Sequence, residues 1–228
     1  MTPKTVLITG SSKGLGRNLA SIFAQNKYNI ILHGRDQPNM AEVADEVLKR
    51  GVVCDAVLGD LSSDKTIDNL YEVAKKRELD ILINNAGMYV HKPFSEMSAK
   101  ELQRIIEVNL IAPALLTMRI YPIMKERKSG TIINISSMAA TVANELEAAY
   151  CASKHGLRGF TRSFQYEAKR HGVRMMSVYL GAMRTAMTAY REDHAQLIDP
   201  FEAAREIFST CKDYESLIIE EIGIRRKR

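Results

Sequence analysis

The sequence lacks the features that identify several large protein classes. It has no tryptophan, and its three cysteines, Cys54, Cys151 and Cys211, show no metal-ligand spacing. An odd number of scattered cysteines is typical of reduced thiols in a cytosolic protein rather than of a disulfide framework. No signal peptide is recognisable, because Lys4 leads directly into a strand-like run, and no apolar stretch approaches the length of a membrane span. We therefore predict a cytoplasmic protein that holds no metal and contacts no membrane.

The excess of positive charge is small and is concentrated at one end. The formal net charge is +5, and the sequence closes with Arg225-Arg226-Lys227-Arg228. We interpret this run as a solvated tail. Nucleic-acid-binding domains usually add a basic helix or aromatic residues interleaved with the basic ones, and the sequence has neither pattern. We therefore expect no nucleic-acid partner.

The sequence does contain a regular alternation of strand-like and helix-like segments. Short apolar runs predict strands at 5–9, 29–33, 52–58, 80–83, 131–135, 173–178 and 216–220. Helical patterns lie between them, after the first strand and at 40–50, 64–76, 99–128, 150–170 and 200–211. This alternation is typical of an α/β fold with one doubly wound parallel sheet between two helical layers. A chain of 228 residues suits one large domain, so we predict a single Rossmann-type domain over 1–228.

The first predicted strand ends in a glycine-rich loop, Gly10-Ser11-Ser12-Lys13-Gly14-Leu15-Gly16, and a helical pattern follows. This order is typical of a dinucleotide fingerprint, because the helix N-terminus offers free N–H groups to a pyrophosphate and glycines let it approach closely. The glycine spacing differs from the common G-x-G-x-x-G pattern, so a merely tight turn is the alternative.

Polar residues also follow the second and fourth predicted strands. Gly34-Arg35-Asp36 lies where an acidic side chain suits the ribose of NAD and an arginine suits the 2′-phosphate of NADP. Asn84-Asn85-Ala86-Gly87 lies where open α/β sheets bind ligands, although the same residues can form a simple Asx turn.

Pro113 interrupts the long helical pattern at 99–128. Because proline has no N–H, the carbonyl of Asn109 loses its helical partner. We expect a kink with a free carbonyl that can hold a water molecule, or a kink with no function.

Tyr150 and Lys154 are four residues apart and share one face of a predicted helix. A free phenol has a pKa of about 10, and a nearby ammonium group lowers it. The pair is therefore a candidate proton donor and acceptor. By spacing alone, a packed tyrosine beside a solvated lysine is the alternative.

Taken together, residues 4–210 resemble the short-chain dehydrogenase/reductase family. The matches are Thr9-Gly10-x-x-x-Gly14-x-Gly16, Asn84-Asn85-Ala86-Gly87, Asn109, Ser137 and Tyr150-x-x-x-Lys154. The resemblance implies an NADPH-dependent oxidoreductase that reduces a ketone or aldehyde to an alcohol by hydride transfer. A protein that binds NADPH as a sensor with little turnover is the alternative. An epimerase or dehydratase is a further alternative. It requires a C-terminal substrate domain, for which the chain has no residues.

The resemblance also implies roles for individual residues. Tyr150 is expected to be the acid/base, and Ser137, rather than the adjacent Ser136, to hydrogen-bond the substrate oxygen. Lys154 is expected to lower the pKa of Tyr150 and hold the nicotinamide ribose, and Asn109 to position a relay water. The implied cofactor-binding residues are Gly10, Ser11, Ser12, Lys13, Gly14, Leu15, Gly16, Arg35, Asp60, Leu61, Asn85, Ala86, Gly87, Tyr150, Lys154, Gly181 and Thr185.

Two cations favour NADPH over NADH. Arg35 and Lys13 fall where the fold is expected to place the 2′-phosphate. Position 34, where NAD-preferring relatives typically carry an aspartate, is a glycine, and Asp36 is one step further along and can point to solvent. The alternative is that both cations are surface charges on an enzyme indifferent to the phosphate.

The substrate remains open at the level of sequence, since Leu180-Gly181 replaces the family's usual Pro-Gly and the chain stops early in a basic segment. The residues expected around the substrate are largely apolar, which suits a hydrophobic or acyl ketone unless several of them are simply core. They are Met88, Tyr89, Met138, Val142, Leu146, Met183, Met187 and Tyr190.

The resemblance further implies a homodimer or homotetramer. Relatives pair through helices corresponding to 99–127 and 150–170, and two-fold symmetry closes such interfaces. Apolar residues on these segments exceed what one sheet face needs. They are Leu110, Leu115, Leu116 and Phe160.

Overall fold

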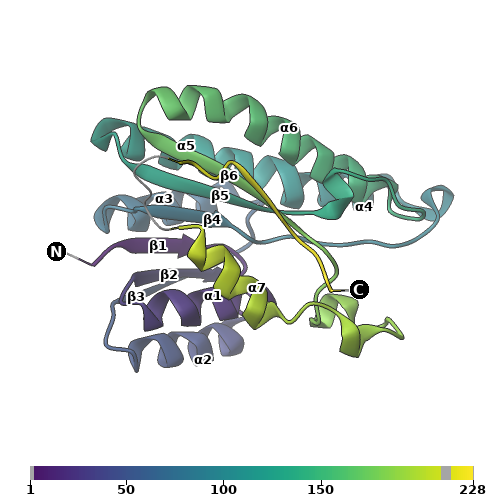
Figure 1. The fold of residues 1–228 in the computed structure, drawn as a ribbon, viewed down its shortest axis with the longest axis horizontal. Coiled ribbons are helices and arrows are strands. Elements are labelled where there is room, and N and C mark those ends of the chain that lie inside the picture. Colours follow the sequence, from purple (N-terminus) through teal and green to yellow (C-terminus); the bar gives the residue numbers. More distant parts are fainter. Residues whose placement is uncertain (1–2, 212–216, 228) are drawn as a thin grey trace.

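A computed structural model describes residues 3–211 and 217–227 and arranges their strands in one seven-stranded sheet (Figure 1). The order is β3-β2-β1-β4-β5-β6-β7, and every neighbouring pair is parallel. The strands are β1 (Thr5–Ile8), β2 (Asn29–Gly34), β3 (Cys54–Leu58), β4 (Ile81–Asn84), β5 (Gly130–Ser137), β6 (Val173–Leu180) and β7 (Glu221–Ile224). The predicted doubly wound parallel sheet is confirmed.

Helices connect the strands and cover both faces of the sheet (Figure 1). They are α1 (Gly14–Gln25), α2 (Gln37–Leu48), α3 (Asp64–Lys76), α4 (Ala99–Ile106), α5 (Ala112–Arg127), α6 (Ala148–Arg170) and α7 (Pro200–Ser209). Short 3₁₀ turns occur at Phe94–Glu96, Met138–Ala140, Ala186–Thr188 and His194–Gln196.

Side-chain caps explain where several helices begin. The Asp36 carboxylate accepts a hydrogen bond from the backbone N–H of Asn39 and caps α2. Ser98 and Glu101 form a reciprocal capping box at the start of α4. Asp199 caps α7, whose first residue is a proline.

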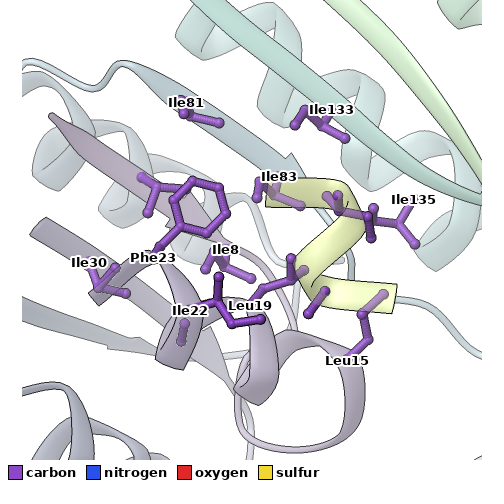
Figure 2. Close-up of a cluster of buried hydrophobic side chains, with 14 of the residues drawn as sticks. Ile8, Leu15, Leu19, Ile22, Phe23, Ile30, Ile81, Ile83, Ile133 and Ile135 are labelled. Atoms are coloured by element: carbon purple, nitrogen blue, oxygen red, sulfur yellow. The ribbon is translucent and has the colours of Figure 1, made fainter. Parts of the chain in front are cut away.

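The core consists of two apolar clusters, one on each face of the sheet. Val6 and Ile8 of β1 belong to the cluster with α1, α2 and α7, whereas Leu7 belongs to the cluster with α3 and α5. Figure 2 shows the first cluster, in which Phe23 of α1 packs among isoleucines of the strands. Strands buried on both faces must be apolar throughout, which explains the continuous apolar runs in the sequence.

The last strand begins later than predicted. The expected strand at 216–220 is wrong over 217–220, and Ser216 lies outside the described residues. Leu217 and Ile218 are 54% and 41% exposed, whereas Ile222 and Ile224 of β7 pack against the first core cluster. Core contact alone does not decide which residues join the sheet, because Ile219 also packs against this cluster but lies outside β7.

The helix predicted at 99–128 has a local interruption just before Pro113. Between α4 and α5 the turn Glu107–Ile111 is a π-helix, in which the N–H of Ala112 bonds to the carbonyl of Glu107. Pro113 lies in the first turn of α5 and is buried. Such π turns widen a helix locally and often occur at functional sites.

The stretch Ala99–Arg127 passes a length and composition test for a membrane span. This finding, which covers the described residues only, contradicts the expectation that no apolar stretch approaches that length. Its most apolar 18-residue segment has a mean hydropathy of 1.2, and 44% of that segment is buried inside the protein. Buried core helices pass the same test, and Leu116 and Ile120 of this stretch belong to the second core cluster.

Candidate active site

The predicted motifs meet at the carboxyl ends of the parallel strands. The strand order reverses between β1 and β4, so the loops after these two strands diverge and leave a crevice between them. The glycine loop follows β1, and Asn85-Ala86-Gly87 follows β4.

Side-chain hydrogen bonds hold the glycine loop against the end of β4. The Thr9 hydroxyl accepts hydrogen bonds from the backbone N–H groups of Asn85 (2.9 Å) and Ala86 (3.0 Å). The Asn85 side chain in turn donates to the carbonyls of Thr9 (2.8 Å) and Gly10 (3.1 Å). Asn85 therefore shapes the loop through its own side chain.

At two positions in this loop, a residue with a Cβ would come too close to neighbouring atoms, so only glycine fits. Gly10 has a φ of +65°, and a Cβ there would lie 2.9 Å from Cα of Ala86. A Cβ on Gly16 would collide with the carbonyl oxygen of Gly10 and lie 2.7 Å from Nδ2 of Asn85. Backbone at this position can therefore approach a ligand more closely than any other residue type would allow.

The same loop fits the phosphates of a dinucleotide. The first turn of α1, which contains Gly14, Leu15 and Gly16, leaves backbone N–H groups without helical partners. Lys13 is the N-cap and, within the described chain, its side chain makes no capping hydrogen bond. A Cβ on Gly14 would lie 3.4 Å from Cγ2 of Thr185, so Thr185 faces the loop. Gly181 follows β6 at the same edge of the sheet.

His33 supports the loop, and the sequence-based prediction missed it. The backbone N–H of Gly10 donates to Nδ1 of His33 (3.3 Å), and Nε2 of His33 lies 3.1 Å from the carbonyl of Gly59. Burial lowers the pKa of His33 to about 4, although the contact with Gly59 opposes this shift. A neutral ring with its proton on Nε2 satisfies both contacts. Only the strand pairing brings these three segments together.

The two serines of the loop are buried. The Ser11 hydroxyl donates to the carbonyl of His33 (3.1 Å) and accepts from its N–H (2.9 Å), so it ties the loop to β2. Ser12 is 7% exposed. The side chain of Ser11 is therefore engaged within the protein, and its backbone N–H also donates to the carbonyl of His33 (2.8 Å).

The predicted phosphate-binding cation Arg35 is exposed and pairs weakly with an acid. Its Nη1 lies 3.4 Å from Oδ2 of Asp60, and the side chain is 72% exposed. Asp60 also accepts hydrogen bonds from Ser62 and Arg104. Burial raises the pKa of Asp60, but these hydrogen bonds outweigh it and hold the pKa well below its usual range. Asp36 does not simply point to solvent, because its carboxylate caps α2.

Leu61, expected at the cofactor, has its side chain in the second core cluster. Asn84 is also turned away from the crevice. Its Nδ2 donates to Asn134 Oδ1 (2.8 Å) and to the Thr117 hydroxyl (3.2 Å) in the interior. The prediction that both amides of Asn84-Asn85 line the crevice is therefore wrong for Asn84.

Asn109 lies on the π turn and connects the end of β4 to α6. Its Oδ1 accepts from the N–H of Met88 (2.8 Å), and its Nδ2 donates to the carbonyl of Met88 (2.9 Å) and to the Ser153 hydroxyl (3.0 Å). The Ser153 hydroxyl donates to the carbonyl of Tyr150 (2.7 Å). Ser153, which the sequence-based prediction did not include, thus couples Asn109 to the turn of α6 that carries Tyr150.

Lys154 is buried beneath this turn. It is 5% exposed, and its Nζ donates to the carbonyl of Ile135 in β5 (3.2 Å). A Cβ on Gly87 would lie 3.7 Å from Nζ of Lys154 and 3.3 Å from Oδ1 of Asn109. The predicted residues Gly87, Asn109 and Lys154 therefore meet at one point. Burial lowers the pKa of Lys154 to about 8.

The pKa of Tyr150 shifts opposite to the expected direction. Burial raises it to about 12, a hydrogen bond with the Ser137 side chain lowers it, and the charge of Glu147 raises it further. Lys154 Nζ lies 5.8 Å from the ring centroid of Tyr150. In this structure burial outweighs any effect of the ammonium group, so Tyr150 keeps its proton at neutral pH.

The adjacent serines differ in their surroundings, and the difference favours the predicted residue. Ser137 is half-buried at the end of β5 and contacts Tyr150. Ser136 is 4% exposed, and its hydroxyl has no hydrogen-bond partner among the described residues. Ser137 is the serine that a reactant beside Tyr150 can reach.

A hydrogen-bonded group of side chains lies next to Tyr150 and consists of Tyr89, Glu147 and Tyr190. The ring of Tyr89 contacts Tyr150 edge-on, with centroids 5.0 Å apart, and its hydroxyl donates to Glu147 (2.6 Å). The Tyr190 hydroxyl donates to that of Tyr89 (3.3 Å), which joins the segment after β6 to the segment after β4. Of the residues expected around a substrate, Tyr89 thus contacts Tyr150 and Tyr190 contacts Tyr89, whereas Met183 packs against the first core cluster.

Among the described residues, no group of three histidine, cysteine, aspartate or glutamate side chains is arranged to hold a metal ion. The site combines a tyrosine hydroxyl, a serine hydroxyl and a buried ammonium group beside the glycine loop. This combination can bind a dinucleotide and transfer a proton next to it.

Comparison with known proteins agrees with this geometry. The family model for short chain dehydrogenases matches residues 4–196. Oxidoreductase UcpA of Escherichia coli is 34% identical over 190 residues, covering 82% of this chain and 72% of that protein. Ketoacyl reductase HetN of Nostoc sp. is 34% identical over 191 residues, covering 82% of this chain and 67% of that protein.

Solved structures give the same result over nearly the whole chain. A metagenomic short-chain oxidoreductase in complex with NADP superposes with a TM-score of 0.87 at 29% identity, covering 99% of this chain and 97% of that one. An alcohol dehydrogenase from the archaeon Thermococcus sibiricus superposes with a TM-score of 0.90, covering 98% and 96%, but at 24% identity this likeness speaks for the fold alone.

Proposed function

The chain belongs to the short-chain dehydrogenase family of oxidoreductases, and from this premise we propose that it reduces a ketone or aldehyde to an alcohol with NADPH. The geometry of Tyr150, Ser137 and Lys154 beside the glycine loop supports the proposal. A cytoplasmic location and a small-molecule substrate belong to the same proposal.

Tyr150 can supply the proton that reduction requires. The bound nicotinamide supplies the hydride, and the resulting alkoxide needs a proton. Tyr150, with a pKa raised to about 12, carries that proton at neutral pH. The Ser137 hydroxyl, which contacts Tyr150, is positioned to donate a hydrogen bond to the same oxygen. Lys154, with a pKa lowered to about 8, is mainly cationic at neutral pH and favours the phenolate left after proton transfer.

Substitution of Tyr150 tests the reaction. Tyr150→Phe keeps the ring that packs on Tyr89 and removes only the hydroxyl. We expect the turnover number to fall by roughly 10²- to 10⁴-fold, as is typical of a general acid, while NADPH still binds. Carbonyl-dependent NADPH oxidation by absorbance and NADPH binding by fluorescence measure the two quantities. Turnover near that of the wild type would exclude Tyr150 as the proton donor.

The preference for NADPH is a separate part of the proposal. Arg35 is exposed and only weakly paired, and Lys13 stands at the start of α1, so both are available to a 2′-phosphate. One charge-assisted hydrogen bond contributes roughly 1.5–3 kcal/mol, or about one to two powers of ten in affinity. Kinetics with both cofactors on the wild type, Arg35→Ala and Lys13→Ala test this preference. It is rejected if the wild type prefers NADH or if neither variant raises KM for NADPH more than KM for NADH.

We also propose a homodimer or homotetramer formed through α4, α5 and α6. Leu116, one of the residues expected to contribute, is fully buried in the core and is not available. Ile111 and Met118 are exposed on the same helical segment, at 45% and 60%, and supply apolar surface in its place. A monomeric mass by light scattering at micromolar concentration would contradict this assembly.

A further inference from the structure

A pocket of about 320 Å³ lies beside the candidate active site, between the segment that follows β6 and the end of the chain. Apolar and basic side chains both line it. They are Met138, Val142 and Leu197, and Arg191, Arg225 and Arg226.

The pocket adjoins the reacting groups. Met138 directly follows Ser137, and Gly181, which also lines the pocket, directly follows β6. A substrate whose carbonyl oxygen is held by Ser137 and Tyr150 can therefore extend its remaining part into this space. The apolar side chains would cover the middle of such a molecule.

Two of the three basic side chains come from the segment that the sequence suggested to be a solvated tail. Arg225 and Arg226 follow β7, and an ion pair between Arg226 and Asp193 (2.8 Å) holds this end against the segment after β6. Figure 1 shows the yellow end of the chain beside that light-green segment. The interpretation as a solvated tail is therefore wrong for Arg226, whereas Arg225 is exposed.

Positive charge in the pocket exceeds negative charge. Asp193 accepts two hydrogen bonds from Arg191 (2.8 and 3.1 Å) in addition to its pair with Arg226. Arg225 forms no ion pair with any described side chain, and no acidic residue lines the pocket. Two of the three guanidinium groups thus share one carboxylate at its edge, and the third, that of Arg225, has its donors available.

We propose that this pocket binds an anionic group, a carboxylate or a phosphate ester, carried by the substrate, and that Arg225 determines this specificity. A guanidinium group donates two parallel hydrogen bonds to either anion. The inference deepens the proposed function, on which it rests: the substrate is a carbonyl compound with an apolar middle and an anionic end.

A binding experiment without turnover tests the pocket. Benzoate and phenyl phosphate serve as the two anionic probes and benzamide as the neutral one, titrated calorimetrically into the full-length protein. We expect Arg225→Ala to weaken binding of at least one anion by roughly tenfold or more, the usual effect of losing a hydrogen bond to a charged group. Arg225→Lys keeps the charge and should restore part of the affinity. The stronger-bound probe identifies carboxylate or phosphate as the preferred anion.

Two controls test whether the anions bind in this pocket rather than elsewhere on the protein. Arg50→Ala removes an equal charge from an exposed residue just after α2 and should leave binding unchanged. Saturating NADPH should also leave the Arg225-dependent binding unchanged. Anion binding that is unaffected by Arg225→Ala, that is absent altogether, or that NADPH displaces would each overturn the proposal.

Turnover provides a second measure. The two substrates are a keto acid, 4-oxo-4-phenylbutanoate, and its methyl ester, which lacks the anionic end. We expect kcat/KM for the acid to exceed that for the ester by about tenfold or more in the wild type but not in Arg225→Ala. The binding experiment needs no catalysis. Anion binding without turnover would therefore contradict the proposed function, whereas turnover without Arg225-dependent anion binding would contradict the inference about the pocket.

Discussion

Hydrogen bonds to backbone groups hold the glycine loop, whereas partly exposed ion pairs between side chains hold the pocket beside Ser137. The first region uses Thr9, Asn85 and His33, whose contacts are to backbone groups. The second uses Asp193 with Arg191 and Arg226, all partly or largely exposed. A buried polar group left without a partner is costly, but an exposed ion pair contributes little. The loop is therefore closely specified by the fold, while the pocket can vary in sequence with little effect on stability.

Acid should destabilise the loop region first, through His33. Its folded pKa of about 4 is below the unfolded value of 6.5, so the unfolded chain binds more protons between these values. Stability from this residue is full above pH 6.5 and is lost as pH falls toward 4, by about 3 kcal/mol in total. Urea unfolding at several pH values measures this slope.

His33→Gln sharpens that prediction, because an amide can still accept from Gly10 and donate to Gly59 but does not titrate. The slope between pH 4 and 6.5 should become smaller in this variant. His155→Gln, at an exposed position on α6, is the matched control. An unchanged slope in His33→Gln would show that other groups cause the acid dependence.

Gly16→Ala should distort the glycine loop, because the added methyl group has no room there. The new methyl group collides with the carbonyl of Gly10, and overpacking of this kind destabilises by about 1–3 kcal/mol. NADPH affinity should fall by more than about tenfold, because the shifted backbone faces the phosphates. Gly159→Ala in α6 has no heavy atom within 4 Å and should instead stabilise by roughly 0.5–1 kcal/mol. Thermal unfolding and NADPH titration measure both variants, and equal behaviour would contradict the prediction.

At the substrate side, Glu147→Gln should change chemistry more than stability. The charge of Glu147 raises the pKa of Tyr150, so its removal should lower that pKa. Reduction requires protonated Tyr150. The activity of the variant should therefore begin to fall at a lower pH than that of the wild type, by less than about one unit. Glu145→Gln changes an exposed acid two residues away and is the control. A shift toward higher pH, or an equal shift in both variants, would argue against this coupling.

The smallest effect is expected for Asp193→Asn. This change removes two exposed ion pairs from the pocket edge and should leave the melting temperature without a resolvable change. Differential scanning calorimetry measures it. A clear decrease would mean that the pocket is held as firmly as the loop, and the contrast between the two regions would no longer stand.

The fold could be predicted from the sequence because its determinants are local. Each buried strand is a continuous apolar run, and helical periodicity separates the runs, so the parallel sheet follows from alternation alone. The glycine loop, Tyr150 and Lys154 could be selected as candidates from their place after a predicted strand or their spacing on a helix, and Asn109 from its position four residues before Pro113, whereas Ser137 was implied by the resemblance to the family. Their roles in catalysis and cofactor binding stay predictions.

Tertiary structure decided what depends on contacts between distant segments. Burial raised the pKa of Tyr150 where spacing to Lys154 suggested a decrease. Strand pairing brought His33 to Gly10, the packing of α6 on the π turn brought Ser153 to Asn109, and β7 carried Arg225 to the pocket beside Met138. None of these pairs is close in sequence, so periodicity carries no information about them. The sequence determined which residues could act and in which order they follow the strands, whereas burial and long-range packing determined their protonation and their neighbours.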